Sequence, residues 1–339
     1  MRCAVLGAGS FGTALAMQLG RLDHEVTLWA RTAHAAEIMQ RTRHNARYLP
    51  EIELPPTVTV SSNTGDVVDG AHLVVAVVPS QVMRQVMGGL SGRLHPNAIV
   101  CSASKGVEEK TLCTMDQVLH QVLPAGLHDR ICAISGPSFA KELAKDMPTA
   151  VVVAGRDEIA THRVAAAFHG SCLRVYHSDD IVGVEVGGAL KNVMAIACGI
   201  ADGMDLGLNA RAAIITRGLA EITRLAVRMG ADPLTLQGLA GMGDLVLTCT
   251  GNLSRNRRVG LALGQGKTLQ QACDELGQVA EGVATARSAF ELGGRLDIEL
   301  PITEQVYRIL YQDKPAGEAL MDLLTRRRRA EQDTGAFHQ

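Results

Sequence analysis

The sequence predicts an α/β domain with a doubly wound parallel sheet, followed by a second domain that is all α-helical. A chain of 339 residues is longer than most single domains, which favours two. In the first half, short runs rich in valine, isoleucine and leucine alternate with helical patterns, as is typical of a parallel sheet covered by helices on both faces. Near 178–182 the strand patterns stop, and long Ala-, Leu- and Gly-rich helical patterns follow.

The elements are expected in the following order. Strands are predicted at 2–7, 25–30, 57–60, 72–78, 98–102, 131–134, 149–154 and 172–176. Helices between them are predicted at 11–21, 33–43, 80–90, 111–122, 138–145 and 157–168. Later helices are predicted at 180–203, 208–230, 255–264, 268–275, 279–293, 302–311 and 315–325. We therefore expect a first domain over 1–179, a second over 180–326 and a solvated polar tail over 327–339.

Charge and composition exclude several classes of function. Lys and Arg total 33 against 35 Asp and Glu, a net charge of −2, so no overall field attracts a nucleic acid. Aromatic residues make up 3% of the chain, too few for a base-stacking platform. The run Arg326–Arg329 is interpreted as part of the solvated tail rather than as a nucleic-acid patch.

Cysteine usage and hydropathy indicate the compartment. The 8 cysteines are scattered without a CxxC pair, and the 11 histidines show no HxH or HxxxH spacing, so we expect reduced cysteines and no metal site. The N-terminus lacks the apolar segment of a signal peptide. The most apolar stretches, 73–79 and 193–201, are shorter than the roughly 20 residues of a membrane span. We expect a cytoplasmic protein with no membrane span.

A glycine-rich turn marks a cofactor site. Residues 7–12 read Gly-Ala-Gly-Ser-Phe-Gly, between a predicted strand and a predicted helix, as in Rossmann-type dinucleotide-binding domains. Gly7 permits the tight turn, Gly9 lets the backbone approach a pyrophosphate, and Gly12 lets helix and strand pack closely. The alternative is a glycine turn in an α/β protein that binds no dinucleotide.

The end of the second strand bears on the choice of cofactor. NAD-specific sites usually place an acidic residue there to bind the ribose 2′-hydroxyl, whereas this chain has Arg31. A guanidinium pairs with a 2′-phosphate or stacks on adenine, so we expect NAD or NADP, with a lean toward NADP. The alternative is a solvent-facing arginine at a strand end.

Two of the few lysines occupy unusual settings. Lys105 follows the strand at 98–102, and ligands bind at the carboxyl ends of strands in open α/β sheets. Lys191 lies in a helix of small apolar residues, where desolvation lowers a lysine pKa toward values useful for proton transfer. Glycines at 183, 187 and 188 thin this helix enough for a ligand to approach. Two alternatives remain open: the ammonium extends into water, or the glycines serve helix packing.

Three further segments are candidate anion or acid sites. Ser138, in the Ser-Gly-Pro-Ser stretch 135–138, is expected to cap the next helix. Asp244 lies in the glycine-flanked turn 241–245, where the alternative is a plain loop cap. Ser254 is expected to cap the helix 255–264, whose free N–H groups and arginines form a phosphate cradle. The alternative there is a basic first turn on a solvated face.

Taken together, these residues make the chain resemble the bacterial-type NAD(P)-dependent glycerol-3-phosphate dehydrogenases. The resemblance covers nearly the full length, except the tail after about 326. The matching stretches, in order, are 7–16, 104–106, 135–142, 190–193, 209–213, 238–245, 248–250 and 254–257.

This resemblance implies reversible hydride transfer between NAD(P)H and dihydroxyacetone phosphate, supplying sn-glycerol 3-phosphate for phospholipid synthesis, by a homodimer. It implies that Lys191 is the general acid/base, that Lys105 contacts substrate and cofactor, and that Asp244 orients the lysine. The implied substrate-binding residues are Lys105, Gly136, Ser138, Lys191, Asp244, Thr248, Ser254, Arg255 and Asn256. The implied cofactor-binding residues are Gly7, Gly9, Ser10, Phe11, Gly12, Arg31, Tyr48, Lys105, Ala140, Arg255, Val279 and Glu281.

Two other functions remain open at this point. One is a dehydrogenase of the β-hydroxyacid type on the same architecture. The other is a dinucleotide-sensing regulator without catalysis, against which the complete set of Lys105, Lys191, Asp244 and Arg255 argues.

Overall fold

The computed structural model describes residues 1–327, and the chain divides into two compact units. The first unit contains Met1–Ser104 and Met115–Ile181, and the second contains Lys105–Thr114 and the chain from Val182 onward. This division differs from a linear boundary at 179/180, because Lys105–Thr114 belongs to the second unit. Of the expected tail 327–339, all but Arg327 lies outside the described residues.

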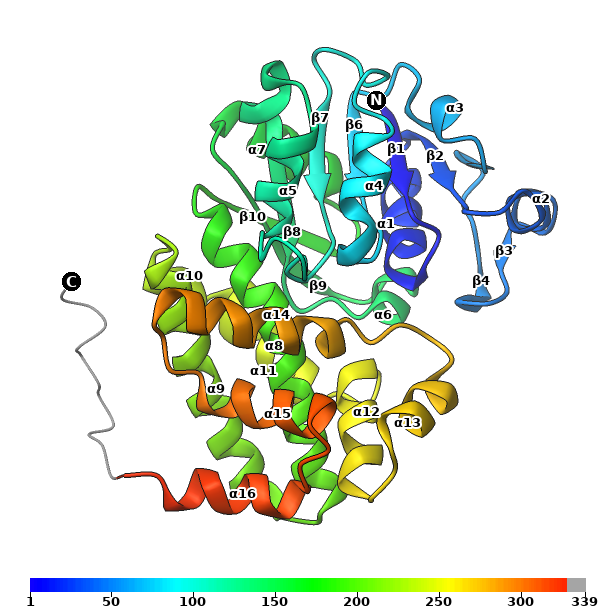
Figure 1. Cartoon of the computed structure of the whole chain (residues 1–339). Helices are drawn as coiled ribbons and strands as arrows, with labels where there is room; N and C mark the ends of the chain where they lie inside the picture. Colours follow the sequence, from blue (N-terminus) through cyan, green and yellow to red (C-terminus); the bar gives the residue numbers. More distant parts are fainter. Residues whose placement is uncertain (328–339) are drawn as a thin grey trace. The chain divides into compact units, whose positions relative to one another are not determined.

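An eight-stranded sheet forms the centre of the first unit (Figure 1). Its strand order is β10-β9-β8-β7-β6-β1-β2-β5, so the chain builds outward from β1 in both directions, as a doubly wound sheet does. The strands are β1 Arg2–Leu6, β2 Glu25–Trp29, β5 Val58–Ser61, β6 Leu73–Ala76, β7 Ile99–Ser102, β8 Ile131–Ser135, β9 Thr149–Gly155 and β10 Leu173–Ser178. All eight predicted strands are present.

The sheet departs from the prediction at one pairing and one addition. β9 runs antiparallel to β8, with Ala133 opposite Ala154, so the sheet is mostly rather than wholly parallel. A strand buried on both faces has the same apolar pattern in either direction, so the sequence does not reveal this reversal. A small antiparallel pair, β3 His44–Asn45 and β4 Leu49–Glu53, was not predicted.

The helices of the first unit follow the predicted alternation with shifted ends, except for the short helix Thr64–Val68, which was not predicted. They are α1 Ser10–Arg21, α2 Ala33–Thr42, α3 Thr64–Val68, α4 Met83–Gly88, α5 Met115–Val122, α6 Ala140–Ala144 and α7 Glu158–Phe168, with 3-10 helices at Ser80–Val82 and Ala125–Arg130. The helix predicted at 111–122 begins only at Met115. Thr32 and Asp157 cap α2 and α7 by accepting backbone N–H groups.

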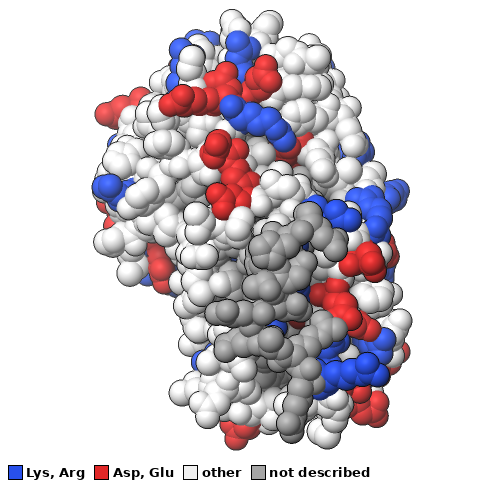
Figure 2. All heavy atoms as spheres, turned by 90° about the vertical axis from the view of Figure 1, so that its left-hand side faces the viewer, with Lys and Arg blue, Asp and Glu red and all other residues white. Residues whose placement is uncertain are grey.

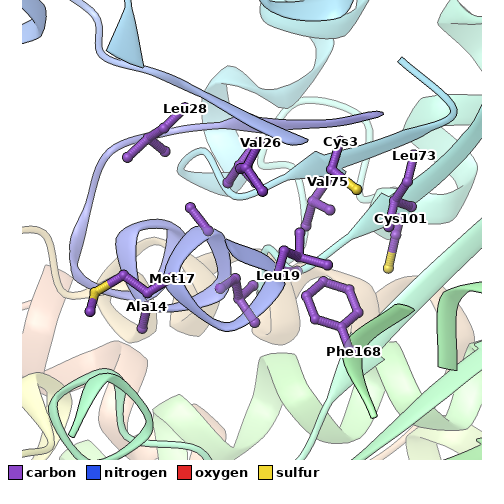
Figure 3. Close-up of a cluster of buried hydrophobic side chains, with 14 of the residues drawn as sticks. Cys3, Ala14, Met17, Leu19, Val26, Leu28, Leu73, Val75, Cys101 and Phe168 are labelled. Carbon is purple, nitrogen blue, oxygen red and sulfur yellow. The ribbon is translucent and has the colours of Figure 1, made fainter. Parts of the chain in front are cut away.

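The core of this unit joins the sheet to the helices that cover it (Figure 3). Val26, Leu28 and Val75 from the strands pack with Leu19 of α1 and Phe168 of α7, and all five are fully buried. Gln18, also buried, donates hydrogen bonds to the Phe168 and Gly170 carbonyl oxygens at 3.1 and 3.0 Å. These contacts fix α1 against the sheet and the end of α7, and α1 begins at the glycine-rich turn.

From Val182 onward the described part of the second unit is helical, apart from its connecting loops (Figure 1). Its helices are α8 Ile181–Gly203, α9 Gly207–Arg228, α10 Pro233–Gln237, a π-helical turn Leu239–Gly243, α11 Asp244–Thr250, α12 Arg255–Gly264, α13 Leu269–Leu276, α14 Glu281–Leu296, α15 Pro301–Tyr311 and α16 Ala316–Thr325. By length and composition α8 is apolar enough to cross a membrane, but 89% of its apolar window is buried inside the protein. We therefore interpret α8 as a core helix.

Glycines bring α8 and α12 into backbone contact. A Cβ atom on Gly199 would lie 2.1 Å from the Arg257 carbonyl oxygen, and one on Gly260 would lie 2.1 Å from the Ile196 carbonyl oxygen. Such distances leave no room for a side chain at these positions unless the two helices shift apart. The first turn of α12 is therefore held against α8, the helix that carries Lys191.

The surface charges are mixed where Figure 2 displays them. On the visible part of this face, clusters of basic side chains lie beside clusters of acidic ones. This pattern agrees with the net charge of −2.

Candidate active site

The glycine-rich turn has the geometry that the sequence pattern predicts. Gly7 adopts a φ of +127°, which favours glycine, and a Cβ atom on Gly12 would lie 1.9 Å from the Gly7 carbonyl oxygen. A Cβ atom on Gly9 would instead meet nothing within 4 Å. Gly7 and Gly12 are thus required by packing, whereas Gly9 leaves open space in front of the N-terminus of α1.

Ser10 and Phe11 form the first turn of α1, so they lie beside this space. No described side chain caps the helix at Gly9, and the first turn carries no acidic residue. The helix end therefore keeps backbone N–H groups and a positive dipole for an anion. A dinucleotide pyrophosphate fits this arrangement.

Asn45 holds the turn in place and was missed by the sequence analysis. Its buried amide donates to the Ala8 carbonyl oxygen at 2.9 Å and to Thr13 Oγ1 at 2.8 Å. The backbone carbonyl oxygen of Asn45 accepts the backbone N–H of Tyr48 at 3.1 Å. Asn45 therefore ties the β3–β4 pair, with the half-buried Tyr48, to the glycine-rich turn. Nothing in the local sequence pattern signals this long-range contact.

Arg31 lies one residue beyond Ala30, between β2 and α2, and its side chain is exposed. Nearby in sequence, the Arg47 guanidinium lies 5.3 Å from the centre of the Tyr48 ring.

Gly136, Ser138 and Ala140 lie where β8 leads into α6, also in the first unit. Gly136 has a φ of +134°, and a Cβ atom there would lie 3.0 Å from Val151 Cα. The prediction that Ser138 caps the next helix is wrong. The hydroxyl of Ser138 donates to the Gly136 carbonyl oxygen at 2.9 Å, and α6 begins at Ala140 with Phe139 as its N-cap. A tight turn thus uses the hydroxyl locally.

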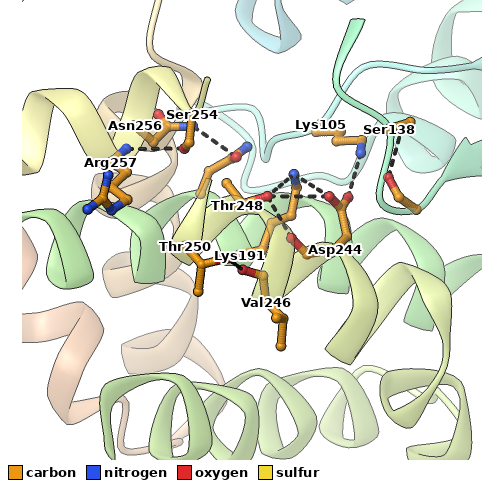
Figure 4. Close-up of polar contacts among 12 residues, drawn as sticks. Lys105, Ser138, Lys191, Asp244, Val246, Thr248, Thr250, Ser254, Asn256 and Arg257 are labelled. Carbon is orange, nitrogen blue, oxygen red and sulfur yellow. Dashed lines mark hydrogen bonds and ion pairs between the residues drawn. The ribbon is translucent and has the colours of Figure 1, made fainter. Parts of the chain in front are cut away.

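The second unit gathers the predicted catalytic residues into one hydrogen-bonded network (Figure 4). Lys191 Nζ donates to Asp244 Oδ1 and to Thr248 Oγ1, both at 2.7 Å. Lys105 Nζ donates to the other carboxylate oxygen, Asp244 Oδ2, at 2.6 Å. The side chains are 9%, 2% and 16% exposed for Lys191, Asp244 and Lys105, so two ammonium groups share one buried carboxylate.

Secondary structure explains why Asp244 and Thr248 meet Lys191 together. They stand four residues apart on α11, hence on one face of the helix, and Thr248 Oγ1 donates to the Asp244 carbonyl oxygen at 2.6 Å. That bond leaves the hydroxyl lone pairs facing the lysine. The expected turn at 241–245 is instead a π-helical turn leading into α11. Gly241 has no room for a Cβ atom, which would lie 2.0 Å from the Leu236 carbonyl oxygen.

Gly187, one turn before Lys191, serves packing. A Cβ atom on Gly187 would lie 2.8 Å from the Ala240 carbonyl oxygen, so this glycine lets α8 approach the π-helical turn. The structure therefore supports the helix-packing alternative at Gly187 rather than ligand access. The alternative of a lysine extending into water is also wrong, because Lys191 is buried.

The charges around Lys191 set its proton affinity. Burial lowers the pKa of Lys191 from 10.5 to about 8, with Asp244 opposing the shift and Lys105 adding to it. Burial alone would raise the pKa of Asp244, but the charges of Lys105 and Lys191 hold it below its ordinary value. Lys191 thus titrates close to neutrality beside a carboxylate that stays ionised.

The start of α12 is fixed to α8 and α14 by a buried asparagine pair. Asn256 Nδ2 donates to Asn192 Oδ1 at 2.9 Å, and Asn256 Oδ1 accepts the Gly282 N–H at 2.9 Å. Asn192 follows Lys191 directly, so this pair ties the lysine's helix to α12. Asn192 and Gly282 were not predicted as site residues.

The remaining predicted residues lie at the same helix ends. Ser254 caps α12 as predicted, its hydroxyl accepting the Arg257 N–H at 3.2 Å. Arg255 is the first residue of α12 and is exposed. Glu281 is the first residue of α14, and Val279, two residues earlier, is 55% exposed. The Asn256–Gly282 bond brings these two helix starts together. Arg257 does not join a phosphate cradle, because it pairs with Asp202 at 2.6 Å.

No group of three His, Cys, Asp or Glu side chains that could hold a metal ion occurs within residues 1–327. The groups available for chemistry in the second unit are therefore two lysines, one carboxylate and the N-terminal ends of two helices. It offers a proton donor, a second cation and two ends of helices with exposed cationic or polar groups.

Comparisons with known proteins give a consistent result. Two family models, described as the N-terminus and the C-terminus of NAD-dependent glycerol-3-phosphate dehydrogenase, match residues 2–161 and 180–321. The chain is 51% identical over 330 residues to glycerol-3-phosphate dehydrogenase (NAD(P)+) of Geobacter sp. (strain M21), covering 97% of this chain and 98% of that protein.

Solved structures agree. The structure of a glycerol-3-phosphate dehydrogenase from Coxiella burnetii is 40% identical with a TM-score of 0.92, and 96% of this chain covers 99% of that one. A glycerol-3-phosphate dehydrogenase from Saccharomyces cerevisiae is 27% identical with a TM-score of 0.81, with coverages of 96% and 99%. These matches do not favour the alternative of a different β-hydroxyacid-type dehydrogenase.

Proposed function

The chain belongs to the family of NAD(P)-dependent glycerol-3-phosphate dehydrogenases, and on that premise we propose which residues bind the substrate and which move the proton. It is an oxidoreductase that interconverts dihydroxyacetone phosphate and sn-glycerol 3-phosphate with NAD or NADP. One observation carries the assignment of roles: Lys191 lies buried between Asp244 and Thr248, with Lys105 on the same carboxylate.

Lys191 is the general acid in reduction and the general base in oxidation. An ammonium has three N–H groups, and among the described residues Asp244 and Thr248 engage two of them, which leaves one for the oxygen on C2 of the substrate. In reduction Lys191 protonates that oxygen, and in oxidation it takes the proton of the C2 hydroxyl. A pKa of about 8 suits both directions, because each protonation state is populated near neutral pH.

Lys105 and Asp244 support this proton transfer. The Lys105 ammonium stabilises the negative charge that develops on the C2 oxygen. Asp244 orients Lys191, and its negative charge limits how far burial lowers the pKa of the lysine. Thr248 fixes the direction of the lysine N–H groups.

The substrate phosphate binds at the start of α12. Arg255 supplies the guanidinium there, and the helix N-terminus supplies the dipole. Ser254 and Asn256 hold this turn. The family resemblance assigns Gly136 and Ser138 to the substrate as well. The first unit binds the dinucleotide, and the second, which includes Lys105–Thr114 and the chain from Val182 onward, supplies the catalytic residues and the phosphate site.

A bound NADPH or NADH supplies the hydride that adds to C2 of the substrate. The open space at Gly9 and the N–H groups of α1 fit its pyrophosphate, with Ser10 and Phe11 beside it. Arg31 and Tyr48 take the adenosine end, and Lys105, Ala140, Arg255, Val279 and Glu281 make the other contacts. The exposed Arg31, with no acid at its position, supports a preference for NADP.

The enzyme forms a homodimer in the cytoplasm and supplies glycerol 3-phosphate for phospholipid synthesis. The 8 cysteines, all free thiols, suit a reducing compartment. Light scattering tests the dimer: a molar mass equal to that of one chain contradicts it.

The absorbance of NADPH tests the function. The purified enzyme should oxidise NADPH with dihydroxyacetone phosphate, and much more slowly with unphosphorylated dihydroxyacetone or with no acceptor. Arg31→Gln should raise the KM for NADPH about tenfold and leave that for NADH within about twofold, because one charge-assisted pair is lost. Equal effects on both cofactors would contradict the role given to Arg31.

A further inference from the structure

Asp202, near the end of α8, joins two arginines from different helices. Its Oδ1 accepts Arg211 Nε and Nη2 at 2.8 and 2.6 Å. Its Oδ2 accepts Arg257 Nε at 2.8 Å and lies 2.6 Å from Arg257 Nη2. The Asp202 side chain is 7% exposed and that of Arg257 is 12% exposed, so this is a largely buried ion pair with both carboxylate oxygens in use.

Arg257 is held on further sides. Its Nη1 donates to Asn252 Oδ1 at 2.9 Å, and its backbone N–H donates to Ser254 Oγ at 3.2 Å. Its carbonyl oxygen lies against α8, where a Cβ atom on Gly199 would come within 2.1 Å. Arg257 is therefore fixed by its side chain, its N–H group and its carbonyl oxygen.

The position of Arg257 explains how a helix can begin with three arginines in four residues. Cations at a helix N-terminus oppose the helix dipole, and Asp202 neutralises the one that sits deepest. Asn256, the residue before it, is fixed to Asn192 and Gly282. Two neighbouring side chains thus anchor the first turn of α12, one through Asn192 and one through Asp202.

We propose that Asp202 is a positioning residue for phosphate recognition. By binding Arg257, it keeps that guanidinium out of the substrate site and fixes the turn that presents Arg255 and the N–H groups of α12 to the phosphate. This inference rests on the proposed function, in which the start of α12 binds the substrate phosphate.

Two simpler roles for Asp202 make different predictions. If Asp202 only lowered the local positive charge, Asp202→Asn would release a cation near the phosphate and lower the KM for dihydroxyacetone phosphate. If it only stabilised the fold, the variant would lose turnover equally with phosphorylated and unphosphorylated substrates. A positioning role raises the KM for the phosphorylated substrate alone.

The test compares Asp202→Asn, Arg257→Gln and the double variant with the wild-type enzyme. Asp322→Asn is the control for the loss of one carboxylate, because it breaks another ion pair of the second unit, with Lys314, at a half-exposed position. The measurements are KM and kcat for dihydroxyacetone phosphate, kcat/KM for dihydroxyacetone, and the inhibition constant of inorganic phosphate.

For each single variant we expect KM for dihydroxyacetone phosphate and the inhibition constant of phosphate to rise about tenfold, which corresponds to the loss of one charge-assisted pair. Values of kcat, and of kcat/KM for dihydroxyacetone, should stay within about twofold. The loss in the double variant should be smaller than the sum of the two single losses, because both substitutions break the Asp202–Arg257 pair. Asp322→Asn should match the wild type.

A lower KM, an equal loss on both substrates, or additive effects in the double variant would each overturn the proposal. If Asp202→Asn does not fold, Arg257→Lys applies the same test, since a lysine cannot bridge Asp202 and Asn252 together. If the wild-type enzyme fails to reduce dihydroxyacetone phosphate, the proposed function fails instead, whatever the variants do.

Discussion

Replacing Asp244 with asparagine should shift the pH dependence of the reaction, because this carboxylate supports the charge of Lys191. The Lys191 ammonium donates to Asp244 Oδ1 at 2.7 Å in a buried site. In Asp244→Asn, Lys105 and Lys191 remain close together without the anion that they share. A charge-assisted hydrogen bond contributes about 1.5–3 kcal/mol, so the pKa of Lys191 should fall by about one to two pH units.

The sign of the effect differs between the two directions of the reaction. Reduction needs protonated Lys191, so in the wild type its kcat should fall as the pH rises through about 8. Oxidation needs the neutral amine, so its kcat should rise over the same range. In Asp244→Asn the pH at which kcat changes should be lower in both directions of the reaction.

The assay is NADPH oxidation by saturating dihydroxyacetone phosphate between pH 6 and 10, with the reverse reaction from glycerol 3-phosphate. Thr248→Val is the graded control, because it removes a neutral acceptor at 2.7 Å and should move the limb in the same direction by less than about one pH unit. A limb that stays at pH 8 in Asp244→Asn, in a folded variant, would refute the role given to the carboxylate.

Two other substitutions separate packing from binding. Gly260→Ala should lower the free energy of unfolding in urea by about 1–3 kcal/mol, because its Cβ atom would lie 2.1 Å from the Ile196 carbonyl oxygen. The control Gly294→Ala on α14 should be neutral or stabilising, since a Cβ atom there would meet nothing within 4 Å. Equal urea midpoints for the two variants would contradict the contact between α8 and α12. Gly9→Val should leave the melting temperature within a few degrees but raise the dissociation constant of NADPH at least tenfold, because the added side chain enters the open space beside α1. Unchanged fluorescence titration of NADPH would show that the pyrophosphate binds elsewhere.

Local patterns in the sequence predicted the parts of the fold that depend on local order. Apolar runs placed all eight strands of the sheet, and Ser254 was correctly expected to cap α12. The same patterns left the direction of β9 undetermined. They also placed Lys105–Thr114 in the first domain, although this stretch packs with the second unit, where Ser288 Oγ donates to the Val107 carbonyl oxygen at 3.0 Å.

The sequence identified the charged residues of the site but not the hydrogen bonds that hold them in place. Lys191 stood out because a lysine is unusual in an apolar helix, and Asp244 because it is an acid among glycines. Asn45, Asn192 and Asp202 carry no such signal. Each acts through a partner distant in sequence, and spacing along a chain does not reveal such pairs. The Ser138 cap failed for a local reason instead, since the hydroxyl donates to the carbonyl oxygen of Gly136, two residues earlier.

The most direct test of Lys191 as the acid/base is the turnover of Lys191→Met, which keeps the length of the side chain and removes its proton. General acid–base catalysis contributes about 10²–10⁴-fold, so kcat should fall by that factor both for reduction of dihydroxyacetone phosphate and for oxidation of glycerol 3-phosphate. The dissociation constant of NADPH should stay within about threefold, as expected for a folded variant with an intact first unit. A kcat within about tenfold of the wild type would contradict the assignment, because the side chain that donates to both Asp244 and Thr248 would then be dispensable for proton transfer.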